Sequence, residues 1–312
     1  MKSEHSEYVG DDAEEINLYE IIAALSKDLK TILFVTAFTS IISLIISLNI
    51  PNIYESKAVL NPLEPKDSIS SSLQNYSNLA GLVGVNIPAQ ASESNSVKAL
   101  EKIKSLSFFE NDIMPNIFLP ELMAVDYWNP DTKKLILNEK IYNESKKIWI
   151  RDFSYPQKQV PSPQESFKKF QDENLRITED KKTGFVTISI QHKSPIVAKK
   201  WVELIVDQIN SFYRTKDTAE AKRTVEYLNL QLDNSKINEV KQVLAELLQT
   251  EIQKLSLIEA NESYVFEYID PPAVMEEKTE PQRMKILLLG LLLGLLLGSS
   301  LVIFKYLRSK RN

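Results

Sequence analysis

The sequence has no cysteine among its 312 residues and only two histidines, His5 and His192. Without cysteine, the chain has no disulfide framework, no thiolate metal ligand and no cysteine nucleophile. Two histidines so far apart provide neither a local metal-binding pair nor a local Ser/His/Asp arrangement. We therefore interpret His192, at the end of a predicted strand, as a structural or surface residue, and expect no metal or cofactor.

An excess of positive charge is also missing. The 37 Lys and Arg residues are outnumbered by 42 Asp and Glu residues, so the net charge is -5 and no basic field favours nucleic acid. The carboxylates of the middle region show no spacing that singles out an acid/base pair. Gly81 and Gly84 are not followed by the Gly-Lys-Ser/Thr of a phosphate loop. We therefore expect no enzyme activity and no nucleic-acid partner.

Two long apolar runs are present, over residues 31–50 and 285–304. Each reaches the roughly 20 residues that a transmembrane helix needs. The first run begins after a long polar leader and exceeds the apolar core of a typical signal peptide, so we interpret it as a span that is retained. The sequence therefore predicts a multi-pass protein with two transmembrane helices.

Positive residues next to the two runs predict how the chain is oriented. Lys27 and Lys30 precede the first run, and a basic cluster follows the second, while Arg283 and Lys285 weakly oppose this bias. We expect both termini to be cytoplasmic, as tails 1–30 and 305–312, with residues 51–284 as a periplasmic domain of a bacterial inner-membrane protein. Both tails are shorter than a kinase or ATPase domain, so any activity is expected to reside elsewhere. The basic cluster consists of Lys305, Arg308, Lys310 and Arg311.

Three glycines in the second run, Gly290, Gly294 and Gly298, recur every four residues. This spacing places them on one face of a helix, where another backbone can approach closely. We predict that they form a transmembrane packing surface. The sequence leaves three partners open: the first span, a neighbouring copy, or another protein.

The middle region combines strand and helix patterns, which predicts an α+β fold. Strands are predicted within IYESKAVLNP, GFVTISIQH and YVFEYIDPP, because these runs are rich in β-branched and aromatic residues or alternate in polarity. Apolar residues at three-residue spacing predict a helix over Val97–Ile113, ended by Pro115. Polar residues over Ser68–Asn78 and the glycine-containing patch Leu79–Ile87 predict loops.

A very long helical region is predicted from Pro195 to about residue 262. Ser194 provides a capping hydroxyl before a proline at the first helical position, and no further proline occurs until Pro271. The region is either one continuous projecting helix or a helix broken near Asp233. An apolar stripe over its second half packs either within the chain or between subunits. This stripe consists of Ile237, Val240, Leu244, Leu247, Leu248, Leu255 and Ile258.

Four stretches resemble the polysaccharide co-polymerase family, in particular the Wzz-type O-antigen chain-length determinants. They are EEINLYEIIAAL, GFVTISIQHKSPIVAKKWVELIV, EAKRTVEYLNLQL and YVFEYIDPPAVMEEKTEPQRMKILLLGLLLG. The last is the most specific, because a strand leads into Asp270 and Pro271, and a charged linker then leads through Pro281 and Arg283 into a glycine-bearing span.

The resemblance implies a membrane-proximal α/β domain with a long projecting helix, assembled into homo-oligomers. It also implies a non-enzymatic role: control of lipopolysaccharide O-antigen length together with the Wzy-type polymerase, acting on undecaprenyl-linked glycan. A capsule or exopolysaccharide export co-polymerase, working with a separate tyrosine kinase and an outer-membrane partner, is the alternative. A two-span ligand sensor and an enzyme that acts directly on glycan are the rivals from other classes.

Overall fold

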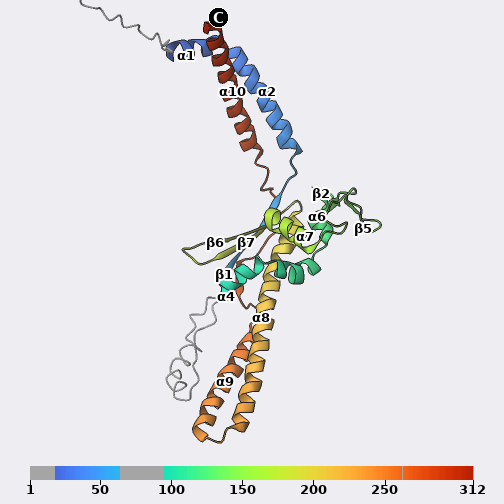
Figure 1. The fold of residues 1–312 in the computed structure, drawn as a ribbon, viewed down its shortest axis with the longest axis vertical. Helices are drawn as coiled ribbons and strands as arrows, with labels where there is room; N and C mark the ends of the chain where they lie inside the picture. Colours follow the sequence, from blue (N-terminus) through green and yellow to red (C-terminus); the bar gives the residue numbers. More distant parts are fainter. Residues whose placement is uncertain (1–17, 64–94, 262, 312) are drawn as a thin grey trace, which may run out of the picture. The chain divides into compact units, whose positions relative to one another are not determined.

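The computed structural model describes residues 18–63, 95–261 and 263–311. It divides into two compact units, one made of Met1–Pro51 and Glu280–Asn312 and the other of Asn52–Thr279 (Figure 1). The predictions for His5, Ser68–Asn78 and Leu79–Ile87, which includes Gly81 and Gly84, lie outside the described residues.

The first unit is built from three helices. They are α1 (Leu18–Lys27), α2 (Leu29–Asn49) and α10 (Arg283–Arg311). Both α2 and α10 are long and apolar enough to cross a membrane, with mean hydropathies of 2.3 and 2.7 over their most apolar stretches. Each helix includes flanking charged residues, because Lys30 and Arg283 continue the helical backbone beyond the apolar runs.

A four-stranded antiparallel sheet forms the centre of the second unit, in the order β6-β7-β1-β8. The chain begins this unit in β1 (Tyr54–Pro62) and ends it in β8 (Phe266–Asp270), so its first and last strands are neighbours. β7 (Val186–His192) pairs with β1 from Tyr54 opposite His192 to Leu60 opposite Val186. The three predicted strands are β1, β7 and β8, whereas the edge strand β6 (Leu175–Glu179) was not predicted.

One helix, α8 (Pro195–Asn234), covers the sheet with the first half of its length. The helix starts at the predicted cap, where the Ser194 hydroxyl accepts a hydrogen bond from the amide of Val197. Buried residues recur at helical spacing along this half and pack against buried residues of the sheet, including Ala58, Leu60 and Ile188. The buried residues of this helical half are Pro195, Val197, Ala198, Trp201, Val202, Ile205, Val206, Ile209 and Tyr213.

The second half of α8 pairs with α9 (Asn238–Ala260) in an antiparallel hairpin. The chain turns at Ser235, whose backbone is extended, after Asp233 and Asn234, which have low helix propensity. The Arg214 guanidinium donates to the carbonyl of Asn261 at 2.6 Å, and the Tyr264 hydroxyl donates to Asp217 at 2.6 Å. The broken helix is therefore the alternative that the structure adopts.

Most of the predicted apolar stripe of α9 packs within the chain. Ile258 is buried, and Val240, Leu244 and Leu255 are half-buried. Ile237 is an exception, because it lies at the turn before α9 and is 59% exposed. Its predicted place in the stripe was wrong, since the helix begins only after it.

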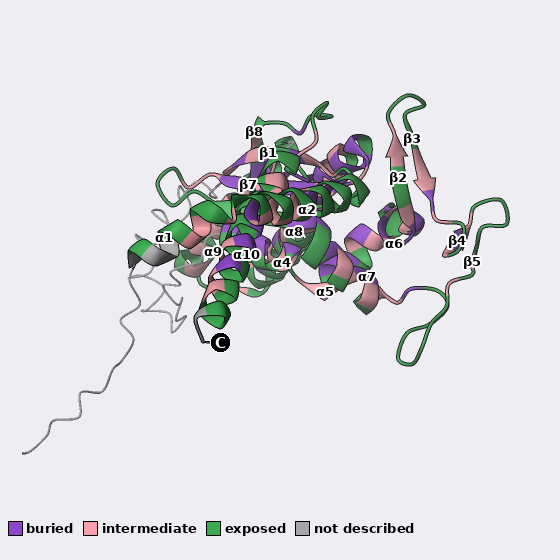
Figure 2. Cartoon of the chain, turned by 90° about the horizontal axis from the view of Figure 1, so that it is seen from above, coloured by how far each residue is buried: buried purple, intermediate pink, exposed green. Residues whose placement is uncertain are grey.

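Between β1 and β6 the described chain forms short helices and two small hairpins. The single helix predicted over Val97–Ile113 is wrong, because the Ser105 hydroxyl caps a second helix by accepting from the amide of Phe108. The two hairpins are largely intermediate or exposed in Figure 2 and were not predicted. The helical segments are α4 (Asn95–Ile103), α5 (Leu106–Phe108), η2 (Phe109–Ile113), η3 (Met114–Asn116), α6 (Leu119–Met123), α7 (Pro163–Lys169) and η4 (Phe170–Asn174). The hairpin strands are β2 (Val125–Asn129), β3 (Lys134–Leu137), β4 (Tyr142–Asn143) and β5 (Ile148–Trp149).

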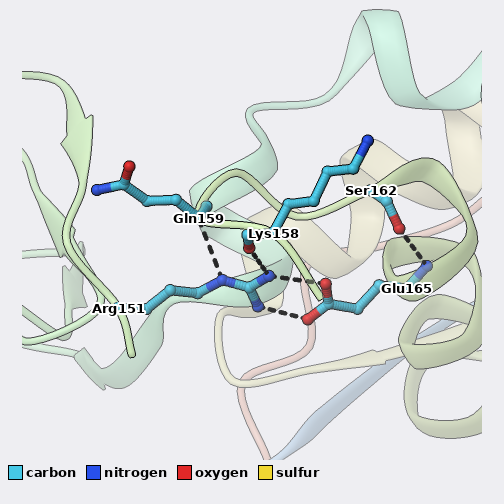
Figure 3. A network of polar contacts seen from close by, with 5 residues as sticks. All are labelled: Arg151, Lys158, Gln159, Ser162 and Glu165. Atoms are coloured by element: carbon cyan, nitrogen blue, oxygen red, sulfur yellow. Dashed lines mark hydrogen bonds and ion pairs between the residues drawn. The ribbon is translucent and has the colours of Figure 1, made fainter. Parts of the chain in front are cut away.

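A bidentate ion pair between Arg151 and Glu165 closes the loop between β5 and α7 (Figure 3). The same guanidinium also donates to the carbonyls of Lys158 and Gln159, at 2.5 and 3.1 Å. Only 12% of the Arg151 side chain and 19% of the Glu165 side chain are exposed. The hydrogen bonds from Arg151 lower the pKa of the Glu165 carboxyl. One arginine therefore holds together both ends of a loop that lacks regular structure.

The His192 ring is buried and fully hydrogen-bonded as a neutral imidazole. Its Nδ1 accepts from the amide of Ser194 at 3.0 Å, so the ring proton lies on Nε2, which donates to the carbonyl of Glu121 at 2.8 Å. Burial lowers the pKa of His192 to about 4. The structural interpretation of His192 thus has a geometric basis, since both ring nitrogens are used within the fold.

The neutral state of His192 predicts a pH dependence of stability. The folded-state pKa lies below the unfolded value near 6.5, so this contribution is complete above pH ~6.5 and is lost as the pH falls toward ~4. The loss approaches about 3 kcal/mol at ~1.4 kcal/mol per pKa unit. Thermal unfolding in detergent should therefore show that the full-length protein loses more stability between these two pH values than its His192→Gln variant does. Parallel curves for the two proteins would contradict the prediction.

The ion pair between Arg151 and Glu165 predicts that substitution of Arg151 measurably lowers the stability of the fold. Arg151→Ala leaves the Glu165 carboxylate largely buried without its partner and should lower the free energy of unfolding by about 2 kcal/mol. Lys104→Ala is the matched control, because its 2.9 Å ion pair with Glu101 is exposed and should contribute less than about 0.5 kcal/mol. Denaturant unfolding of the full chain compares the two variants. Equal losses would show that burial does not strengthen the Arg151 pair.

Candidate functional site

The glycine face of α10 packs against α2 of the same chain. Gly290, Gly294 and Gly298 are buried while the leucines between them are exposed, and Val302 continues the buried row at 2% exposure. Of the three partners that the sequence left open, the structure places the first apolar helix against this face.

The two helices approach so closely that side chains on the glycine face would collide with α2. A Cβ at Gly290 would overlap the Ser43 side chain, and one at Gly294 would overlap the Thr39 hydroxyl and lie 2.7 Å from the Cα of Thr36. At Gly298 a Cβ would lie 3.0 Å from the Cα of Ile32. Backbone atoms of α2 cannot move aside as a flexible side chain can, so any larger residue must push the helices apart.

Three hydroxyl groups of α2 that face α10 are hydrogen-bonded, whereas that of the buried Ser47 has no partner among the described residues. The Thr36 hydroxyl donates to the carbonyl of Ile32 at 2.8 Å, and the Thr39 hydroxyl donates to the carbonyl of Thr36 at 3.0 Å. The Ser43 hydroxyl instead crosses to α10 and donates to the carbonyl of Ile286 at 2.7 Å. In an apolar environment, unpaired polar groups are costly, so these bonds allow small polar residues to line the contact.

A charged contact marks the end of the helix pair at which α2 begins. The Lys305 ammonium lies 2.9 Å from the Asp28 carboxylate, and both side chains are accessible. Beyond this contact, the outward surfaces of both helices are almost entirely large apolar residues, such as Phe34 on α2 and Leu292 on α10. The pair thus combines a close internal contact with an apolar exterior.

The four residues of the linker motif are divided between the two units. Asp270 is the last residue of β8 and lies opposite Val59, next to an irregularity in the pairing, and Pro271 follows it. Pro281 and Arg283 belong to the other unit, where Arg283 begins α10 and its amide donates to the carbonyl of Pro281 at 3.0 Å. The motif therefore marks the two ends of the returning segment.

The returning segment is tied to the beginning of β1 by contacts that the sequence did not reveal. The buried Ser56 hydroxyl donates to the carbonyl of Ala273 at 2.8 Å. The amide of Thr279 donates to the carbonyl of Ile53 at 2.8 Å. A serine on the face of β1 that Ala58 and Leu60 continue as buried apolar residues was the available signal for such a contact. The entering and leaving chains of the second unit therefore run side by side.

Perturbed acidic groups of the second unit do not assemble into a metal site. Burial raises the pKa of the Asp207 carboxyl, and the neighbouring Glu203 carboxylate raises it further. Burial also raises the pKa of the Tyr268 hydroxyl, with smaller contributions from the same two carboxylates. Within residues 18–63, 95–261 and 263–311, no group of three or more His, Cys, Asp or Glu side chains could hold a metal ion. The helix pair therefore remains the best-defined candidate site.

The close helix contact predicts a strong effect of Gly294→Leu. Overpacking at this position should destabilise the α2–α10 pair by about 2 kcal/mol, because the new side chain meets α2 backbone atoms. Ser300→Leu adds comparable bulk at an exposed position of the same helix and should change stability by less than about 0.5 kcal/mol. Unfolding of the full-length variants in mixed micelles measures the difference. Equal stability of the two variants would contradict the packing role of Gly294.

Comparison with known proteins found one matching family model. Residues 14–111 match the family model described as "Wzz: Chain length determinant protein". This match confirms the resemblance to Wzz-type polysaccharide co-polymerases over the amino-terminal part of the chain. A search of curated protein sequences found no significant match.

Two solved structures are similar to this chain at low sequence identity. A "full-length bacterial polysaccharide co-polymerase" is 12% identical with a TM-score of 0.40, and the alignment covers 95% of this chain and 99% of that chain. A fragment of WzzB, a polysaccharide co-polymerase from Salmonella Typhimurium, is 13% identical with a TM-score of 0.28 and is aligned over 73% of this chain and 100% of the fragment.

Proposed function

We propose that this chain, whose residues 14–111 match the Wzz chain length determinant model, sets the number of repeat units in bacterial O-antigen. The match supports chain-length regulation in polysaccharide synthesis, and this observation carries the proposal. The narrower assignment to lipopolysaccharide and to a Wzy-type polymerase is our inference.

The arrangement of the membrane helices supports a location in the inner membrane. The apolar helices α2 and α10 would cross the bilayer together, and residues 51–284 would form the periplasmic domain. Lys27, Lys30, Lys305 and Arg308 lie at or near the end marked by the Asp28 contact, which supports cytoplasmic termini. Polymerisation of undecaprenyl-linked glycan would then take place beside the spans.

The proposed role is regulatory and depends on assembly instead of a reaction. The helical hairpin of α8 and α9 exposes large apolar residues that the single chain leaves uncovered, which supports packing against further copies of the chain. Such a homo-oligomer, bound to the polymerase through its spans, would limit how long each glycan is retained. The exposed residues are Tyr227, Leu230, Ile252 and Leu257.

Deletion of the gene tests the proposal through the lipopolysaccharide ladder on a gel. The modal cluster of O-antigen lengths should disappear on deletion and return when the wild-type gene is restored. Restoration with Ser300→Leu should return the same cluster, whereas Gly294→Leu, expressed to the same level, should give a broadened distribution because the helix contact is disrupted.

The other outcomes of this experiment separate the alternatives. An unchanged ladder together with altered surface capsule would overturn the O-antigen assignment and favour the export co-polymerase. An unchanged ladder and unchanged capsule would contradict chain-length regulation itself.

A further inference from the structure

The short helix α1 has one apolar face that its own chain leaves largely uncovered. Ile22 is 57% exposed, and Leu25, three residues later and therefore on the same helical face, is half-buried. Lys27 is exposed and points about 140° away from Ile22 around the helix at 100° per residue. α1 is thus amphipathic, with its apolar residues on the less protected side.

α1 does not continue the direction of α2. The helix is interrupted at Asp28, and both views show α1 lying across the end of the helix pair, next to the carboxyl-terminal end of α10 (Figures 1 and 2). Asp28 is also the residue that forms the ion pair with Lys305. The interruption therefore lies at the level where the apolar surface of the pair gives way to charged residues.

Exposed apolar side chains lie on both sides of this interruption. Ile22 lies on α1, and Leu29, Leu33 and Phe34 on α2 are 52%, 64% and 74% exposed. The exposed apolar residues of α2 face lipid in the proposed bilayer, and α1 lies at the end of the same helix pair, at the boundary of that lipid. An amphipathic helix at this depth buries its apolar face between the headgroups and the acyl chains.

We propose that α1 is an interfacial anchor that binds the phospholipid surface of the bilayer crossed by α2 and α10. The face of Ile22 and Leu25 lies in the boundary between headgroups and acyl chains, and Lys27 extends to the aqueous side, where anionic headgroups attract it. This inference rests on the proposed membrane position of the helix pair. The anchor fixes the angle at which the chain enters α2 and so restrains the whole pair against tilting.

The absence of cysteine allows a direct test with single spin labels in the full-length chain. Ile22→Cys and Lys27→Cys place a nitroxide on the two sides of α1, and Leu292→Cys places one on the exposed surface of α10. The labelled proteins are reconstituted in bilayers of phosphatidylcholine with or without phosphatidylglycerol. Collision rates with oxygen, which concentrates in lipid, and with a water-soluble nickel complex are then measured at each position.

The proposal predicts that the label at position 22 collides more often with oxygen than with the nickel complex. At position 27 the order of the two collision rates should be reversed. Phosphatidylglycerol should further reduce the nickel accessibility at position 22, because the anionic surface draws Lys27 and Lys30 closer. The label at position 292 should be the most accessible to oxygen of the three.

Two results would overturn the inference. Equal and high nickel accessibility at positions 22 and 27 would place α1 in water. Low accessibility to both reagents at position 22 would show that protein, such as a second copy, covers the apolar face of α1. If position 292 is also water-accessible, the membrane-spanning premise fails; if only position 22 is, the premise stands and the anchor is wrong.

Discussion

Close contact between two helical backbones is possible only where one of them lacks side chains, and this constraint governs the apolar unit. The three glycines of α10 provide a surface without side chains, and Thr36, Thr39 and Ser43 of α2 lie against it. Residues of this size leave the helices in contact along their length, and their hydroxyls find carbonyl partners in the pair itself. Because α2 precedes the second unit in the chain and α10 follows it, both connections to that unit start from one paired structure.

In the second unit, too, segments far apart in the sequence are held together, here by hydrogen bonds in place of close helix packing. β1 and β8 are adjacent, and the segment after β8 is bonded to the segment before β1 through Ser56 and Thr279. Asn210 of α8 adds a further link, because its carboxamide oxygen accepts from the amides of Val265 and Phe266 and its nitrogen donates to the carbonyl of Phe266. The helix that covers the sheet thus also fixes the strand by which the chain leaves it.

Sequence reasoning succeeded where a local pattern determines the structure. The apolar runs, the alternating strand β7 and the Ser194-Pro195 cap each depend on neighbouring residues, and the structure contains all three. It failed at Ser105, because a capping serine within an apolar periodicity looks like an ordinary polar position of one helix. It also missed the ion pair between Arg151 and Glu165, since no local pattern connects an arginine to a glutamate fourteen residues away. The glycine spacing indicated a contact surface, but the choice of α2 as its partner depends on complementary residues more than 240 positions earlier.

The hairpin of α8 and α9 has a consequence for how such a domain can diversify. α8 leads away from the sheet after β7 and α9 leads back toward β8, while the turn between Asn234 and Asn238 belongs to neither the core nor the sheet. Equal insertions on the two sides of this turn, in steps of about 3.6 residues, would lengthen the hairpin without altering the register of a single strand. Evolution can therefore vary the length of the helical hairpin independently of the sheet and of the helical half that covers it.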